Sequence, residues 1–288
     1  MIPKVIHYCW FGRNPLPPFA VKCIESWKKF LPGYEIKEWN EDNFDVNIIP
    51  YTQEAYEARK YAFVSDYARF YILYHHGGIY FDTDVEVIKS IDDIIERGAF
   101  MGCENEAKPG ATALAVAPGL GLGCNPGLGL GCNPGLGLGC NPGLGLGCNP
   151  GLGLGCNPGL GLGCNPGLGL YAEILGLYAG LHFLRSNGGL NLKTVVEYTT
   201  ELLSAKGLKN VNEMQCVADV WIYPKEYFCP VNYQTNEMNI TDNTRSIHHY
   251  AASWHGTRQI LFKLVSKIVG KDVAHKISAI VKSFNLIK

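Results

Sequence analysis

The chain has 288 residues, of which 47% are hydrophobic, and this composition excludes disorder over most of its length. Its 25 Lys and Arg residues nearly cancel its 26 Asp and Glu residues, so the formal net charge is -1. A chain without a basic excess lacks the field that attracts polyanions, and we therefore expect no nucleic-acid partner.

The N-terminal segment alternates between strand and helix patterns. Residues 2–10 form a β-branched and aromatic run that predicts a buried strand. Residues 19–31 carry an apolar face at helical spacing, Pro32 and Gly33 end this helix, and residues 34–39 predict a second strand. Strand, helix and strand in this order favour an α/β domain whose sheet is at least partly parallel.

A second helix and strand follow, and two carboxylates stand at the end of that strand. Apolar residues recur at helical spacing from residue 62 until Gly77, and residues 79–81 form a short apolar strand that leads into Asp82 and Asp84. In open α/β sheets, ligand crevices form at the carboxyl ends of strands. Carboxylates in a D-x-D arrangement bind Mg²⁺ or Mn²⁺ through one or two oxygens and leave other positions for water and substrate phosphates.

The helix before this strand carries a polar cluster. Ser65, Asp66 and Arg69 stand at i, i+1 and i+4 beside an aromatic face. The same spacing also fits a surface ion pair between Asp66 and Arg69 that contributes under about 1 kcal/mol.

Residues 119–166 are one octapeptide, GLGLGCNP, written six times without a substitution. This identity indicates recent tandem duplication or an assembly artefact. Each copy alternates Gly and Leu before a turn, so a stack of short strands is one interpretation. We favour a weakly ordered insertion that projects from the edge of the domain, because glycine entropy opposes folding. Cysteines spaced by eight match no familiar zinc site.

The remainder of the chain combines further α/β elements with a basic tail. Residues 171–184 and 192–205 predict helices, residues 217–223 a strand, and residues 224–230 an aromatic loop. Residues 258–288 alternate apolar side chains with lysines and form a basic amphipathic helical tail. Such a tail either lies on an anionic membrane surface or packs on its own domain.

The cysteine pattern and the N-terminus bear on location. Five cysteines outside the repeat are scattered along the chain, which favours a reducing compartment. The N-terminal MIPKVIHYCWFG lacks a signal-peptide pattern, and the chain has no apolar run of the length that spans a bilayer. We therefore expect a cytoplasmic protein, with the tail as a peripheral contact at the inner face of the plasma membrane.

Three stretches together resemble a known family. They are MIPKVIHYCWFG at the start, FVSDYARF through IYFDTD at residues 63–84, and IHHYAASW at residues 247–254. These motifs resemble the sugar-binding region of D-x-D glycosyltransferases, in particular family 32 with its capsular polysaccharide enzymes and mannosyltransferases, and they are similar to the glucosyltransferase domains of large clostridial toxins. The resemblance covers nearly the whole chain outside the repeat and the tail.

The resemblance implies a GT-A fold in residues 1–255, interrupted by the repeat. In that fold a mixed, mostly parallel sheet belongs to one α/β domain, and a nucleotide-sugar lies over the strand ends with Mn²⁺ or Mg²⁺ on its diphosphate. Trp10 matches the aromatic position that stacks on the nucleotide base, although a core Trp at the end of the first strand is the alternative. Asp66 and Arg69 match positions that hold donor-sugar and ribose hydroxyls, and Ser65 supports them.

The remaining implied roles concern the cation and the diphosphate. Asp84 binds the metal directly, whereas Asp82 reaches the ribose or a metal-bound water. His249 matches a third metal contact, with His248 or His255 as alternatives. Ser253 and Trp254 match a flexible loop that closes on the diphosphate. Asp82, Asp84, Arg69 and Asp66 are thus the expected catalytic group.

The implied activity is retaining transfer of a hexose from a nucleotide-sugar to a cell-surface glycan, a capsule or lipopolysaccharide acceptor, or a lipid-linked acceptor. The sequence offers no obvious carboxylate nucleophile. The resemblance implies a front-face displacement in which the departing phosphate helps to deprotonate the acceptor. A sugar-nucleotide- or glycan-binding relative inactivated by the repeat is the main alternative. A metal-dependent phosphatase or nuclease is a weaker one, because the chain has no second acidic cluster or basic nucleic-acid track.

Overall fold

The computed structural model describes residues 1–104, 158–232 and 237–251. The chain divides into two compact units, Met1–His249 and Tyr250–Lys288, and the following description concerns the first. The tail predicted at 258–288 and residues 119–157 of the repeat lie outside the described residues. Within the described residues, no helix is long and apolar enough to cross a membrane.

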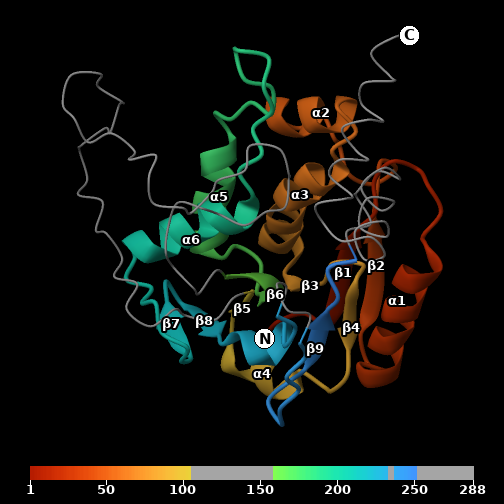
Figure 1. Ribbon diagram of the computed structural model, residues 1–288, viewed down its shortest axis with the longest axis vertical. Helices are drawn as coiled ribbons and strands as arrows, with labels where there is room; N and C mark the ends of the chain where they lie inside the picture. The colour runs from red at the N-terminus through yellow and green to blue at the C-terminus, as the bar shows by residue number, and fades with distance from the viewer. Residues whose placement is uncertain (105–157, 233–236, 252–288) are drawn as a thin grey trace, which may run out of the picture. The chain divides into compact units, whose positions relative to one another are not determined.

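The elements alternate along the chain as an α/β domain requires (Figure 1). The helices are α1 (Pro18–Phe30), α2 (Pro50–Glu57), α3 (Tyr61–His76), α4 (Asp92–Arg97), α5 (Gly169–Tyr178), α6 (Val195–Ala205) and α7 (Lys225–Phe228). The strands are β1 (Val5–Cys9), β2 (Glu35–Trp39), β3 (Gly78–Tyr80), β4 (Val85–Val87), β5 (Phe100–Cys103), β6 (Pro158–Cys164), β7 (Gln215–Val217), β8 (Val220–Tyr223) and β9 (Ser246–His248).

A seven-stranded sheet in the order β2-β1-β3-β6-β5-β8-β7 forms the centre of this unit. β1 pairs in parallel with β2 and β3, and β5 pairs in parallel with β8. β6 runs antiparallel to both β3 and β5, and β7 runs antiparallel to β8. The α/β class and the mixed, mostly parallel sheet are therefore confirmed. The carboxyl ends of β1, β2, β3, β5 and β8 share one edge of this sheet.

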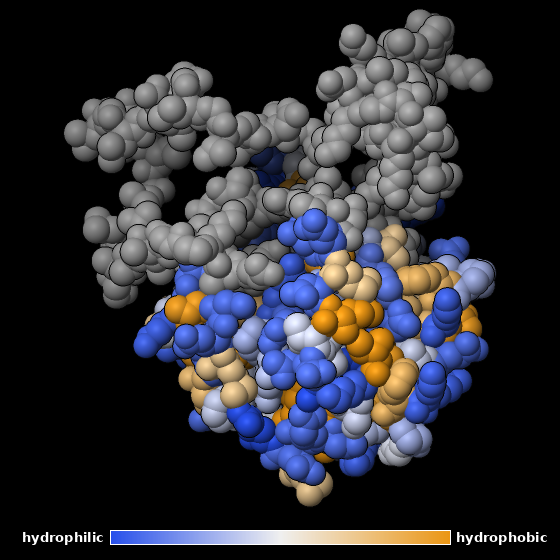
Figure 2. Space-filling model, turned by 60° about the horizontal axis from the view of Figure 1, so that its bottom comes forward, coloured by the Kyte–Doolittle hydropathy of each residue, from blue (hydrophilic) through white to orange (hydrophobic). Residues whose placement is uncertain are grey.

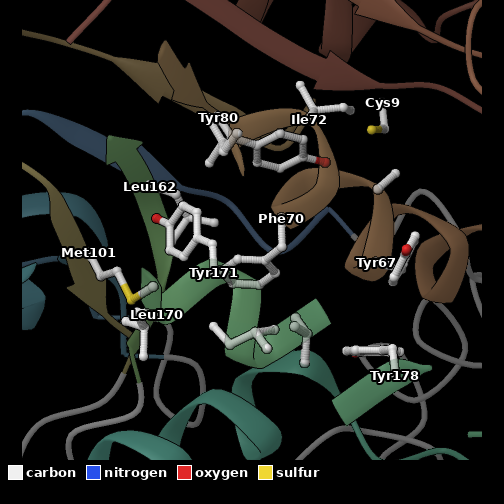
Figure 3. Packing of buried hydrophobic residues seen from close by; sticks show 14 of the residues in the cluster. Cys9, Tyr67, Phe70, Ile72, Tyr80, Met101, Leu162, Leu170, Tyr171 and Tyr178 are labelled. Carbon is white, nitrogen blue, oxygen red and sulfur yellow. The ribbon is translucent and has the colours of Figure 1, made fainter. Parts of the chain in front are cut away.

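The two faces of the sheet bury separate hydrophobic clusters. Successive strand residues point to opposite faces, so Ile79 and Phe81 join the cluster beside α1 and α4, whereas Tyr80 joins the cluster beside α3 and α5. In the second cluster the rings of Phe70 and Tyr171 meet edge to face at 4.8 Å (Figure 3). Burial of side chains on both faces of the sheet thus fixes the position of β3. The molecular surface seen in Figure 2 is mostly hydrophilic, with a small group of hydrophobic residues among the polar ones.

The last copy of the repeat is part of the central sheet. Residues 159–164 belong to β6, which lies between β3 and β5, so the interpretation of 119–166 as one projecting insertion is wrong for this copy. Leu162 and Cys164 are buried on one face. On the other face, a Cβ at Gly163 would lie 2.2 Å from the ring of Phe100, so only glycine fits beside that ring.

Gly163→Ala is therefore expected to lower the free energy of unfolding by about 1–3 kcal/mol, because the added methyl forces Phe100 or the strand to move. The matched control is Gly169→Ala, since a Cβ at Gly169 meets nothing within 4 Å. Urea unfolding of both variants measures the difference. Equal midpoints for the two variants would show that β6 does not pack against Phe100 in this way.

Two sequence predictions in the C-terminal half are wrong in detail. The strand expected at 217–223 is a hairpin, because Ala218 and Asp219 both have positive φ angles and reverse the chain between β7 and β8. No glycine or asparagine marks this turn, which explains why the sequence pattern hides it. The helix expected at 171–184 ends at Tyr178, where Ala179 and Gly180 follow.

Candidate active site

Asp82 and Asp84 lie in the turn between β3 and β4, at the edge where the parallel strands end. The backbone N–H of Phe81 donates to the carbonyl of His7 at 3.1 Å, so the pairing with β1 continues past the end of β3. The N–H of Val85 donates to the carbonyl of Asp82 at 3.0 Å and closes the turn. This register holds both carboxylates beside the end of β1.

Arg69 joins the two acidic motifs of the site. Its guanidinium lies 3.0 Å from Asp66 Oδ1 and 3.2 Å from Asp82 Oδ1, and its side chain is only 8% exposed. It also lies over the ring of Tyr80 at 4.9 Å, and the Tyr80 hydroxyl donates to Asp82 at 3.1 Å. Burial lowers the pKa of Arg69, but Asp82, Tyr80 and Asp66 outweigh burial and raise it above its usual value. The surface ion pair considered from the sequence is instead a buried network.

Asp66 approaches the site from α3 and is held by the start of α6. The backbone N–H of Val195 donates to Asp66 Oδ2 at 3.4 Å. Burial raises the pKa of Asp66 to about 6; Arg69 opposes this shift and Asp82 adds to it. The carboxylate is therefore charged at neutral pH, and this charge lowers the free energy of unfolding. Buried groups with such shifted pKa values are typical of functional sites.

Asp66→Asn is expected to stabilise the fold in a pH-dependent way. Because the folded-state pKa of Asp66 lies above its usual value of 3.8, the folded state binds the extra proton, and stability falls as the pH rises from 3.8 to about 6. The free energy of unfolding of the wild type should fall relative to that of Asp66→Asn by about 2 kcal/mol across this window. Unfolding at a series of pH values measures this difference.

Asp93→Asn serves as the control for that series. The hydrogen bond from Arg245 lowers the pKa of Asp93, so loss of this carboxylate should produce a small difference of the opposite sign. A pH-independent difference between wild type and Asp66→Asn would contradict the raised pKa of Asp66.

Asp84 is paired with His248 from β9. The Nε2 atom of His248 lies 3.2 Å from Asp84 Oδ1, and both side chains are almost fully buried. Burial lowers the pKa of His248, but the charge and hydrogen bond of Asp84 outweigh burial and raise it well above its usual value. The two-stranded antiparallel sheet that β9 forms with β4 thus supplies a cationic partner for the D-x-D motif.

The side chain of His249 contacts Glu86 and does not face Asp84. Its Nε2 lies 2.8 Å from Glu86 Oε2, and its ring meets Phe19 edge to face at 5.1 Å. Neighbouring residues in an extended chain face opposite sides, so β9 brings His248, and not His249, to Asp84. His255, Ser253 and Trp254 lie outside the described residues.

Glu104 is a site residue that the sequence analysis did not identify. It directly follows β5, as Asp82 follows β3 after one intervening residue, and both strands run antiparallel to β6. Burial raises the pKa of Glu104 to about 7; the charge of His248 opposes this shift, and that of Asp82 adds to it. A carboxylate immediately after a buried strand was the available sequence signal.

The donor set fits a hard divalent cation. The site contains four carboxylates that are coupled directly or through Arg69 and His248: Asp66, Asp82, Asp84 and Glu104. These carboxylates outnumber the two cationic side chains. Among the described residues, no group of three or more His, Cys, Asp or Glu side chains is placed to hold a metal alone. Asp82 and Asp84 would therefore supply one or two oxygens, and the phosphates of a bound ligand and water would supply the rest.

Trp10 lines a hollow at the ends of β1 and β2. The hollow has a volume of about 440 Å³ and is also lined by Arg13, Asn14, Pro15, Glu38, Asn40, Glu41 and Asp42. Trp10 is half-buried, and its indole N–H donates to the carbonyl of Asn14 at 2.6 Å. Its position on this hollow differs from that of a closed core Trp such as Trp27, which is 0% exposed.

Ser65 contributes through its backbone. Its hydroxyl donates to the carbonyl of Tyr61 within α3, and its own carbonyl accepts from Arg69 Nε at 3.3 Å. Ser65 thus orients the guanidinium of Arg69.

Comparison with known proteins finds a family match over the part of the chain that holds the candidate site. Residues 17–101 match the family described as "Glycosyltransferase sugar-binding region containing DXD motif". This match confirms the resemblance inferred from the motifs, and it includes Asp66, Arg69, Asp82 and Asp84.

Individual relatives are similar to about a third of this chain. A glycosyltransferase of Acanthamoeba polyphaga mimivirus is 37% identical over 35% of this chain and 42% of its own length. An inositol phosphoceramide mannosyltransferase of Schizosaccharomyces pombe is 31% identical over 35% of this chain and 29% of its own. The chain thus spans less than half the length of these relatives. The solved PaToxG glycosyltransferase aligns with 37% of this chain and 51% of its own at 20% identity and a TM-score of 0.30, too low to define a shared fold.

Proposed function

We propose that this protein is a metal-dependent, retaining glycosyltransferase that moves a hexose from a nucleotide-sugar to a cell-surface glycan or a lipid-linked acceptor. One observation carries the proposal: Asp82 and Asp84 stand at the carboxyl end of β3, and Asp82 connects through Arg69 to the buried Asp66. The family match over residues 17–101 supports glycosyl transfer, and the name of the yeast relative supports a hexose such as mannose.

The donor would extend along the carboxyl edge of the sheet. The hollow beside Trp10 offers a flat aromatic face and hydrogen-bonding groups for a nucleoside, and its volume lies in the range of small-molecule sites. Asp82 and Asp84 follow the neighbouring strand, where a cation-bound diphosphate would lie. Asp66 accepts hydrogen bonds and would hold sugar hydroxyls, while Arg69 fixes the orientation of Asp66 and Asp82.

In the proposed step, the bond between the anomeric carbon and the diphosphate oxygen breaks. The acceptor hydroxyl forms a new bond to the same face of that carbon, and its proton passes to the departing phosphate oxygen. A bound Mn²⁺ or Mg²⁺ supplies positive charge that stabilises the leaving diphosphate. The chain's own residues bind and orient: Asp82 and Asp84 hold the cation, and His248 positions Asp84 through their 3.2 Å contact.

The test is transfer from a panel of radiolabelled nucleotide-sugars to soluble glycans and to lipid-linked acceptors, with Mn²⁺, with Mg²⁺ and with a chelator. We expect labelled product only with a divalent cation, with the donor anomeric configuration retained. Donors that bind without turnover would instead favour a non-catalytic sugar-nucleotide-binding protein, and a thermal shift with the donor detects such binding. Release of inorganic phosphate without sugar transfer would contradict the proposal.

A further inference from the structure

The segment between α5 and α6 is a hairpin with an unusual surface. Leu184 pairs with Leu190 in antiparallel register, the N–H of Asn191 donates to the carbonyl of Phe183 at 2.7 Å, and the N–H of Arg185 donates to that of Gly189 at 2.8 Å. These bonds define a two-stranded hairpin over residues 182–192. Figure 1 shows it projecting beside α2.

The inner face of the hairpin is anchored in the core. Phe183 is 0% exposed, and its ring meets that of Tyr51 edge to face at 5.6 Å. The carboxamide of Asn191, opposite Phe183, donates to the hydroxyl of Tyr198 at 3.2 Å. At the side of the hairpin, Glu54 of α2 accepts from the N–H of Leu184 at 2.8 Å. The hairpin is therefore held in a fixed orientation.

Alternation along an antiparallel ribbon then directs the neighbouring side chains outward. Leu184 is 44% exposed and Leu192 is 50% exposed, so the hairpin presents two large apolar side chains to solvent. Arg185 stands exposed at the turn between them. The sequence from residue 177 to residue 193 contains no Asp or Glu. Glu54 of α2, the acid that lies against the hairpin, is engaged by His182 Nδ1 at 2.6 Å and by the N–H of Leu184.

The hairpin also lines an open hollow of about 610 Å³. The hairpin residues that line it are His182, Leu184, Arg185, Ser186 and Asn187. The residues that line the hollow supply an apolar side chain, a guanidinium and hydrogen-bonding groups. A phospholipid offers the matching chemistry, since an anionic phosphate lies next to an acyl chain.

We propose that the hairpin 182–192 docks this protein on an anionic phospholipid membrane. Leu184 and Leu192 enter the boundary between headgroups and acyl chains, and Arg185 binds a lipid phosphate. The ribbon continues within three residues to Val195, whose N–H donates to Asp66, so the docking surface is contiguous in sequence with the candidate active site. Membrane docking does not depend on the proposed transfer reaction, and it is measured without donor or acceptor.

The test is flotation of the full chain with phosphatidylcholine vesicles that contain or lack phosphatidylglycerol. The double variant Leu184→Ser, Leu192→Ser should reduce binding to the anionic vesicles by about tenfold or more, because it removes two apolar side chains from the interface. Arg185→Gln should reduce binding by about fivefold to anionic vesicles only. Leu177→Ser is the matched control, since Leu177 is 43% exposed on α5 outside the hairpin, and its binding should equal that of wild type.

Circular dichroism and thermal unfolding establish that each variant is folded. The proposal is overturned if wild type does not float with anionic vesicles, or if the double variant floats as well as wild type, because the tail at 258–288 would then carry the binding. It is equally overturned if Leu177→Ser loses as much binding as the double variant. A wild type that stays with the soluble fraction as a dimer, and becomes monomeric in the double variant, would identify a second copy of the chain as the occupant.

Discussion

Asp84→Asn is expected to reduce kcat/KM for sugar transfer by about 10²–10³-fold or more while leaving the protein folded, because it removes a charged oxygen donor from the proposed cation site. Asp84 also pairs with His248, so the amide leaves a buried imidazolium with less compensation. Part of the lost activity should therefore be accompanied by a lower thermal midpoint. Initial rates at several Mn²⁺ concentrations measure the effect, and the apparent affinity for Mn²⁺ should fall as well.

Glu86→Gln is the matched control for this variant. Glu86 lies two residues further along the same chain segment and pairs with His249 at 2.8 Å, as Asp84 pairs with His248. Glu86 is 41% exposed, compared with 13% for Asp84. Glu86→Gln should leave transfer and its Mn²⁺ dependence unchanged. Equal losses in the two variants, or full activity of Asp84→Asn in a chelator, would refute a cation role for Asp84.

The elements that the sequence predicted share a strong local pattern. The helix from residue 61 to 76 and the strand at 78–80 were predictable because aromatic residues recur at helical spacing and Gly77 ends the helix. The same local reading located the D-x-D motif at a strand end. β5 and β9, which have four and three residues, were not predicted from the sequence.

The place of β6 in the sheet cannot be predicted from local sequence patterns. Six copies have identical sequences, so intrinsic propensity cannot distinguish one from another. The last copy joins the sheet where it precedes α5 and lies between β3 and β5. Its glycines, which argue against a stable strand in isolation, are required there by the rings of Phe100 and Phe228.

The candidate site shows the same division between local and tertiary information. Asp66, Arg69, Asp82 and Asp84 come from one contiguous region, and their residue types and spacing predicted them. The choice between His248 and His249 depends on the register of β9 against β4, where a shift of one residue exchanges the two side chains. Glu104 required knowledge that β3 and β5 run in the same direction, which only the pairing with β6 establishes.

Arg69→Met is expected to be the most destabilising substitution in the site and to abolish transfer. Arg69 is the cationic partner of both Asp66 and Asp82, and its removal leaves two carboxylates in a buried setting without that partner. Loss of one partner from a buried ion pair lowers the free energy of unfolding by about 3–5 kcal/mol. Arg13→Met removes a contact to Asp42 on the surface, where the side chain of Arg13 is 61% exposed, and should leave the free energy of unfolding nearly unchanged.

A triple variant separates the charge effect from lost packing. Combining Arg69→Met with Asp66→Asn and Asp82→Asn removes both unpaired carboxylates, so much of the lost stability should return although the Arg69 side chain is still absent. Activity should not return, because the donor-binding carboxylates are gone. If the triple variant is as unstable as Arg69→Met alone, packing against Tyr80, and not charge compensation, is what Arg69 contributes to the fold. Urea unfolding at neutral pH distinguishes the two results, and a recovery that disappears at acidic pH would assign the effect to the carboxylate charges.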